Sequence, residues 1–304
     1  MKALSINNEA ARPRPRGALS FPVVYMLKAV GKSFLPPLIV PLLFLLLWQF
    51  LAGRVDNQII LPSVGQVGSI LAHPTEDLIS MGSLLTNVVV SLSRVLAGYL
   101  LAMVLAVPLG VAIGSQPLLG RLLNSFLGLF RSIPPLAWVP LVLAWFGVAS
   151  LASVTSLPIN AAYLYLHNIK LSMLFIIFIG GFYPILTSAI HGVQMVPATL
   201  LDAARVLGAD RKDIFLKILL PAAAPSIVNG LRIGLGVSWM CLVSAEMLPG
   251  SLSGVGYLIT HAYTVAQTDI VIAGMVSIGL IGAGLDLGFR LLEERKFKWK
   301  RLSR

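Results

Sequence analysis

Charged residues are scarce in this sequence. Asp, Glu, Lys and Arg make up 12% of its 304 residues, whereas a soluble domain of this length carries about twice that fraction. Cysteine is nearly absent as well: Cys241 stands alone, so no intramolecular disulfide is possible. Histidine is sparse and shows no metal-ligand spacing, with the four residues dispersed at His73, His167, His191 and His261. A soluble domain, a disulfide scaffold and a metal site are therefore all disfavoured.

The sequence also lacks a phosphate-binding loop. Gly31-Lys32-Ser33 resembles the end of one, but the glycine required five residues before Gly31 is replaced by Met26. No strand–loop–helix context surrounds this segment, and no cluster of polar catalytic residues interrupts the apolar runs. We therefore expect a non-catalytic chain that binds neither ATP nor another cofactor itself.

Long apolar runs dominate what is present. Hydrophobic residues form 57% of the chain, and runs of 18 or more recur, which is typical of transmembrane helices. The runs are continuous and rich in Leu rather than alternating, which favours helices over the strands of a barrel. The sequence predicts an all-α integral membrane protein with about six spans, at 35–53, 84–114, 120–147, 171–194, 222–248 and 267–291.

The net charge of +11 is distributed as in a membrane protein rather than a nucleic-acid-binding one. Basic residues gather at both ends of the chain and around residues 202–221, while the loops assigned to the outside contain only Arg54 and Lys170. Lys and Arg mark the cytoplasmic ends of spans. An even number of spans places both termini in the cytoplasm. We expect a basic tail and interfacial segment at 1–34, a membrane domain at 35–292 and a basic tail at 293–304.

One polar segment, at 197–221, interrupts the apolar runs on the cytoplasmic side. Asp202 falls in the early turns of a predicted helix, where a carboxylate favours the helix dipole. Gly208 is predicted to end that helix, and Asp210 to cap a second short helix. Pro221 then ends this helix or begins the next span. The pattern indicates a helix–glycine–helix unit outside the lipid, suited to contact a partner in water.

The spacing within the polar segment resembles a family signature. Asp202-Ala203-Ala204, Gly208, Ile218 and Leu220-Pro221 match E-A-A, three residues, Gly, nine residues, I-x-L-P, except that Asp replaces Glu. This signature belongs to permease subunits of bacterial ABC importers. Three further phrases are similar to the branch that handles nitrate, sulfonates, taurine and bicarbonate, and the resemblance covers roughly 36–292. The phrases lie at 131–140 with 145–147, at 230–237 and at Ala245-Glu246.

The resemblance implies a bundle like that of type I ABC importer permeases in the inner membrane of a bacterium. The polar segment would be the coupling helix of a homodimer that contacts two ATPase subunits, and a periplasmic or lipid-anchored binding protein would deliver a small anion. Membrane lipid would surround the spans. The residues implied in coupling are Asp202, Ala203, Ala204, Arg205, Gly208, Ile218 and Pro221. The alternative is an ion-coupled secondary transporter, which predicts inverted repeats and mid-membrane carboxylates; no repeat is evident.

Several charged residues lie in or near the predicted spans, where an unpaired charge is expensive. Arg131 precedes Pro134-Pro135, where helix hydrogen bonding is broken, and a broken helix in a membrane faces protein or a water-filled cavity. Arg131 is therefore the first candidate for an anion pathway; Trp138, Glu246 and Arg94 are further candidates. The alternative is an internal ion pair between Arg131 and Glu246, with Trp138 as a packing residue.

The remaining charges have simpler interpretations. Arg94 and Arg232 would extend toward a membrane interface, and Asp286 would pair with Arg290 four residues on. The outward loop 148–170 is longer than in the family that the chain resembles. With Pro158, Tyr163, Tyr165 and His167 it forms either an interfacial helix or a contact for the binding protein.

Overall fold

The structure is all-helical. The computed structural model describes residues 23–55, 57–147, 149–155, 166–247 and 251–296, in which every regular element is a helix. In chain order these are α1 (Val23–Val55), α2 (Val64–Ala72), α3 (Leu84–Ser115), α4 (Pro117–Arg131), η1 (Pro135–Trp138), α5 (Val139–Phe146), α6 (Leu151–Thr155), α8 (Leu171–Gln194), α9 (Ala198–Val206), α10 (Arg211–Asp213), η2 (Ile214–Leu219), α11 (Leu220–Glu246), α12 (Val255–Thr264) and α13 (Thr268–Lys296).

Four uninterrupted helical stretches among the described residues are long and apolar enough to cross a membrane. They are Leu84–Ser115, Leu171–Gln194, Arg211–Glu246 and Thr268–Lys296. They agree with the spans predicted at 84–114, 171–194, 222–248 and 267–291. The described apolar part of the first predicted span, Ile39–Val55, is shorter. The part of the chain that the structure describes therefore contains four candidate spans, or five if the broken pair described next is one span.

The span predicted at 120–147 is not one continuous helix. Its two halves, Ser125–Arg131 and Pro135–Phe146, meet at an angle of 87°. Pro134 and Pro135 have no backbone N–H to donate, and their rings collide with the preceding turn of a helix, so α4 ends at Arg131 and the chain turns. The predicted break at this Pro-Pro pair is confirmed, and the span predicted at 120–147 is either one broken span or a re-entrant loop.

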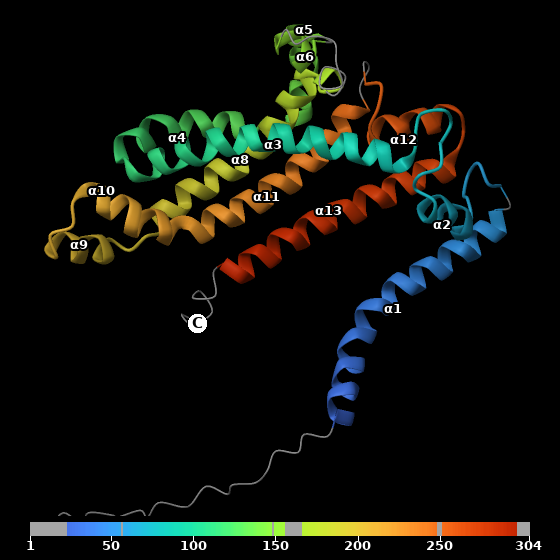
Figure 1. Cartoon of the computed structure of the whole chain (residues 1–304), viewed down its shortest axis with the longest axis horizontal. Coiled ribbons are helices and arrows are strands. Elements are labelled where there is room, and N and C mark those ends of the chain that lie inside the picture. The colour runs from blue at the N-terminus through green and yellow to red at the C-terminus, as the bar shows by residue number, and fades with distance from the viewer. Residues whose placement is uncertain (1–22, 56, 148, 156–165, 248–250, 297–304) are drawn as a thin grey trace, which may run out of the picture.

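The core is formed by α3, α8 and α11, which run side by side (Figure 1). Glycines bring these helices close together. A Cβ atom at Gly110 of α3 would lie 2.6 Å from Ala189 Cβ of α8, and one at Gly234 of α11 would lie 2.6 Å from Ile185 Cγ1. In lipid no hydrophobic force drives helices together, and small residues of this kind permit the close van der Waals packing that holds them in contact. The three helices therefore form one closely packed unit.

The polar segment and the outer elements occupy opposite ends of this unit. Figure 1 shows α9 and α10 at one end, α2 and α12 at the other, and α1 turned away from the bundle. The indole Nε1 of Trp48 in α1 donates a hydrogen bond to the carbonyl of Pro62, 3.0 Å away. Of the outward loop, α6 and a backbone bridge between Ser150 and Lys170 are described; Pro158, Tyr163 and Tyr165 lie outside the described residues.

A buried ion pair joins α3 and α11 at the end of the bundle opposite α9. Arg94 and Glu246 are 2% and 0% exposed, with 2.6 Å between Arg94 Nη1 and Glu246 Oε1. The other guanidinium hydrogens reach the carbonyl of Asn168, at 2.9 Å, and both oxygens of Ser253. A buried pair is tolerated when its remaining donors and acceptors are also bonded. Arg94 therefore binds the loop before α8 and the loop before α12 to the bundle.

The carboxylate of Glu246 is bonded on its second side as well. It accepts hydrogen bonds from the Ser91 hydroxyl at 2.8 Å and from the backbone N–H of Gly256 at 3.0 Å. Gly254 lies directly against it with φ of +109°, in a region that L side chains rarely adopt. A Cβ atom there would lie 2.2 Å from Glu246 Oε1. We refer to Ser91, Arg94, Glu246, Ser253 and the 254–256 backbone as the outer network.

A second ion pair links α11 to α13. Arg232 donates to both oxygens of Asp286, at 2.5 Å and 2.8 Å. Three expectations are therefore wrong. Arg94 and Arg232 have partners instead of extending to an interface, and Asp286 pairs with Arg232 rather than Arg290. Sequence spacing favours pairs within one helix, whereas these residues meet across helices because a charge in lipid takes the partner that packing brings nearest.

Alanine at position 254 tests the outer network. In Gly254→Ala the new Cβ atom would displace the Glu246 carboxylate from Arg94, and breaking a buried pair costs roughly 3–5 kcal/mol. We expect a clearly lower melting temperature in detergent. Gly68→Ala in α2 is the control, because a Cβ atom there meets nothing within 4 Å. Equal melting temperatures for the two variants would contradict the structural role of the network.

Candidate functional site

The polar segment presents an exposed helix, α9, at one end of the bundle (Figure 1). Its Ala204 is 7% exposed and packs inward. Asp202 and Arg205 face outward at 63% and 64% exposure and form an ion pair of 2.6 Å with each other. Val206 and Leu207 follow, each 87% exposed. An apolar pair this exposed beside charged side chains is typical of a surface that contacts another protein.

Gly208 ends α9 as predicted from the sequence. Its φ is +84°, and its N–H bonds to the carbonyl of Arg205 at 3.0 Å, which is the glycine-terminated helix end expected there. Asp210 then caps α10, since its carboxylate accepts from the N–H of Asp213 at 2.6 Å. Pro221 lies in the first turn of α11. The predicted helix–glycine–helix unit is therefore confirmed.

The second half of the polar segment differs from the expected α-helix. Residues Ile214–Leu219 form a π-helical turn, η2, a rare form that appears mostly as single turns at functional sites. Phe215 and Leu219 of this turn pack against Val111, Val193 and Ala223. The wider turn connects α10 to α11 while its apolar side chains stay on the bundle, so the polar segment is anchored to all three core helices.

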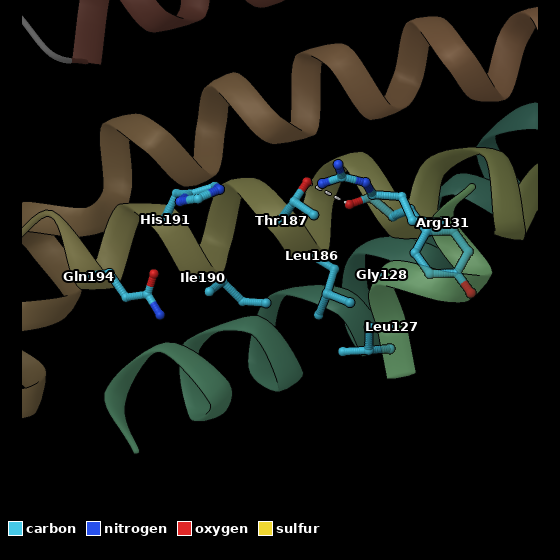
Figure 2. A pocket seen from close by; sticks show the side chains of 9 residues that line it. Leu127, Gly128, Arg131, Leu186, Thr187, Ile190, His191 and Gln194 are labelled. Carbon is cyan, nitrogen blue, oxygen red and sulfur yellow. Dashed lines mark hydrogen bonds between the residues drawn. The ribbon is translucent and has the colours of Figure 1, made fainter. Parts of the chain in front are cut away.

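Arg131 lies at the end of α4 beside two cavities. One, of about 200 Å³, lies between α4 and α8, and we call it the α4–α8 cavity. The other, of about 370 Å³, extends from Arg131 to Ile233 and Val237 of α11, and we call it the α8–α11 cavity. Figure 2 shows the Arg131 side chain reaching back toward Thr187 of α8. Arg131 is exposed, and among the described residues its guanidinium has no acidic partner.

The suggested ion pair between Arg131 and Glu246 is wrong, because Glu246 is bonded to Arg94 in the outer network. The structure brings Arg94 and Glu246 together but not with Arg131, and neither lines the two cavities that Arg131 borders. Burial explains this separation. Both side chains are almost fully enclosed, whereas a group that acts on a passing solute must be reached by water.

Trp138 lies in η1, just after the break at Pro134-Pro135, and belongs to a group of aromatic side chains from α4, η1 and α8. Its ring stacks on Phe130 with 6.1 Å between centroids and meets Phe175 edge-on at 6.2 Å. Its indole Nε1 is buried without a hydrogen-bond partner among the described residues. A buried indole N–H usually finds a partner. The packing interpretation fits these contacts, which hold η1 against α4 and α8.

Four polar side chains of α8 beside Arg131 were missed by the sequence reasoning. Tyr183, Thr187, His191 and Gln194 all line the α4–α8 cavity. They are separated by four, four and three positions, so they share one face of the helix. That spacing within an apolar span was the signal available in the sequence. The spacing did not single these residues out, because each of the four residue types occurs on its own in membrane helices.

Residues 98–298 match the family model described as binding-protein-dependent transport system inner membrane component. A putative ABC transporter permease protein of Methanocaldococcus jannaschii is 44% identical over 87% of this chain and 91% of its own length. The nitrate import permease protein NrtB of Leptolyngbya laminosa is 34% identical over 90% and 92% of the two chains. The taurine transport system permease protein TauC of Escherichia coli is 34% identical over 69% and 68%.

A solved structure shares the fold. It is a chain of the inward-facing MetNI methionine ABC transporter, which superposes with a TM-score of 0.52, covers 68% of this chain and 95% of its own, and is 18% identical in sequence. At this identity the likeness shows the fold alone.

The family match, which spans more than half of the chain, decides against the alternative of an ion-coupled secondary transporter. It also implies that separate ATPase and binding-protein subunits act with this chain. Members of this family are non-catalytic and bind no cofactor. The chain belongs to the family of binding-protein-dependent transport system inner membrane components and is the multi-pass permease subunit of an ABC importer.

Proposed function

We propose that this permease translocates a small anion of the nitrate, sulfonate or taurine, or bicarbonate class. The observation that carries the proposal is Arg131, which has no acidic partner among the described residues, unlike Arg94 and Arg232. It stands where α4 ends and two cavities meet. A cation in such a place raises the local concentration of anions.

The substrates named for related permeases support the same class of small anions. Beside the taurine and nitrate permeases, a putative aliphatic sulfonates permease of Bacillus subtilis and a bicarbonate permease of Synechocystis are 32% and 31% identical to this chain. All four named substrates carry a compact oxygen-rich anionic group. A single guanidinium suits such a group, because its planar fork of N–H donors matches paired oxygens.

We propose further that two copies of this chain form the pathway above two ATPase subunits, with α9 as the coupling helix. The exposed Val206 and Leu207 supply an apolar contact, and Asp202, Ala203, Arg205 and Gly208 form its surroundings, while Ile218 and Pro221 connect it to α11. A second copy fits the apolar face of α4, which stays exposed in one chain at Leu118, Leu122, Phe126 and Leu129. A binding protein would deliver the anion to the opposite end.

The orientation that we propose places α9 and both termini in the cytoplasm. Support comes from the basic residues near α9, which include Arg211, Lys212 and Lys217, and from Arg295 and Lys296 at the end of α13. Such residues mark cytoplasmic ends. The proposed organisation keeps a basic segment at 1–34, a membrane domain at 35–292 and a basic tail at 293–304. It fits a bacterial or an archaeal membrane equally, since one relative is archaeal.

Purification and uptake test the function. The tagged permease, expressed with the genes around its own, should bring down a separate ATPase in stoichiometric amount. Proteoliposomes that contain this complex and its binding protein should accumulate nitrate, taurine or bicarbonate only when ATP is supplied. ATP-dependent accumulation of a cation or a sugar in place of these anions would overturn the substrate class, and uptake driven by an ion gradient alone would overturn the mechanism.

The coupling role of α9 is tested by Gly208→Asp. Nothing lies within 4 Å of the Cβ position, so the variant should insert normally, but it places a charge at the proposed contact and strains a backbone at positive φ. We expect loss of uptake and of ATPase stimulation by the binding protein. Gly208→Ala is the control, because it strains the same turn without adding charge. Normal uptake and ATPase stimulation by Gly208→Asp would contradict the coupling role.

The role of Arg131 is tested by Arg131→Ala. Because the guanidinium has no partner to lose, the complex should assemble and hydrolyse ATP, while anion uptake at low concentration should fall at least about tenfold, the loss of roughly 1.4 kcal/mol of attraction. Arg131→Lys should retain part of the uptake. Arg121→Ala, on the same helix and outside both cavities, is the control. Unchanged affinity and turnover in Arg131→Ala would remove this residue from the pathway.

A further inference from the structure

We infer, on the basis of the proposed function, that one face of α8 is the inner half of the anion route. This face consists of Tyr183, Thr187, His191 and Gln194, and we call it the polar face of α8. It begins beside Arg131 and ends at the last residue of α8, next to the polar segment. Its side chains would bind the anion in succession and determine which anions pass.

Three cavities adjoin one another along this face. The α8–α11 cavity shares Arg131, Tyr183 and Thr187 with the α4–α8 cavity. The α4–α8 cavity shares Gln194 with a third cavity of about 600 Å³, which we call the inner cavity. The inner cavity reaches α9 and α10, where Arg205 and Arg211 line it. A route along α8 therefore has cationic side chains at both of its ends.

The donors on this route are free to bind a solute. Among the described residues, the side chains of Arg131, Tyr183, His191 and Gln194 have no hydrogen-bond or ion-pair partner. Each carries at least one N–H or O–H donor, and anions are bound by donors. Thr187 differs, since its hydroxyl donates to the carbonyl of Tyr183 in its own helix, at 2.8 Å. Its oxygen faces the cavity as an acceptor for the water that hydrates the ion.

The sign of the charge along the route is uniform. Within the described residues, no Asp or Glu lines any of the three cavities. Two arginines elsewhere in the spans are neutralised by a carboxylate, Arg94 by Glu246 and Arg232 by Asp286. A cation would meet Arg131 at one end of this route and Arg211 at the other, and neither has an ion-pair partner among the described residues, whereas Arg205 is paired with Asp202. The route therefore favours anions by charge.

The volume of the smallest of the three cavities agrees with a small solute. The α4–α8 cavity, at about 200 Å³, equals the liquid volume of roughly six or seven water molecules. That space holds a compact anion with part of its hydration shell. The apolar side chains of Leu127, Leu186 and Ile190 close its other sides (Figure 2), which leaves the polar face of α8 and Arg131 as its hydrogen-bonding surface.

Thiol labelling tests the route without an uptake assay. The native Cys241 is buried and serves as the unlabelled background. His191→Cys and Gln194→Cys, each in the assembled importer in detergent, are treated with an anionic reagent, 2-sulfonatoethyl methanethiosulfonate, and a cationic one, 2-(trimethylammonio)ethyl methanethiosulfonate. Each rate is divided by the rate of the same reagent with free glutathione. We expect the anionic reagent to be favoured roughly tenfold, the lower end of electrostatic focusing in charged clefts.

Two matched variants complete the labelling experiment. Adding Arg131→Gln to His191→Cys should remove most of the preference, because the cation that attracts the reagent is gone. Tyr263→Cys on α12, at a side chain 77% exposed and outside the three cavities, should show no preference. Equal normalised rates at positions 191 and 194, no labelling there, or a preference that survives Arg131→Gln would each overturn the inference.

Transport by charge variants separates this inference from the proposed function. In an importer that accumulates nitrate, taurine or bicarbonate, Gln194→Glu should lower uptake at least about tenfold by placing a carboxylate on the route, with ATPase stimulation retained. Gln116→Glu, at an exposed position before α4 and outside the three cavities, should transport normally. Equal uptake by the two variants would reject the polar face of α8 while the anion importer stands. Absence of anion uptake in the unchanged complex would reject the proposed function itself.

Discussion

A charge within the hydrocarbon layer requires either a bonded partner or water, and the structure depends on this constraint. Arg94 meets Glu246 and Arg232 meets Asp286, so two of the intramembrane arginines serve to join helices. Unpaired charge is expensive in lipid, and Arg131 therefore stands where the helix is broken and cavities open. The same rule makes Arg94 and Arg232 structural and, on the proposed function, leaves Arg131 available to a solute.

The two ends of the bundle are built in opposite ways. At the end near α12, Arg94 and Glu246 use their bonding capacity internally and tie loops to α3 and α11. At the opposite end, α9 leaves charged and apolar side chains exposed. Between them, α3, α8 and α11 are packed through glycine contacts, and closely packed interiors transmit displacement rather than absorb it. On the proposed function, a pull on α9 reaches α8 and its polar face because the two helices are consecutive.

Local features were predictable because they depend on residues that are near in sequence. The glycine that ends α9, the cap at Asp210 and the break after Arg131 each follow from the backbone chemistry of one or two residues. The π-turn η2 was not predictable, since the pattern of its apolar residues suits an α-helix as well, and only packing against α3, α8 and α11 distinguishes the two.

The sequence by itself determined that this is a helical membrane protein, where its polar segment lies and which family it resembles. These properties follow from composition, from the length of apolar runs and from spacing along the chain. Only the tertiary structure decided which charges pair. Arg94 and Glu246 are far apart in the sequence, and Asp286 had a plausible neighbour in Arg290, yet helix packing brings other partners within bonding distance. The same packing placed Arg131 and the polar face of α8 around one cavity. Neighbouring helices determine what surrounds a side chain, and the sequence alone does not show which helices are neighbours.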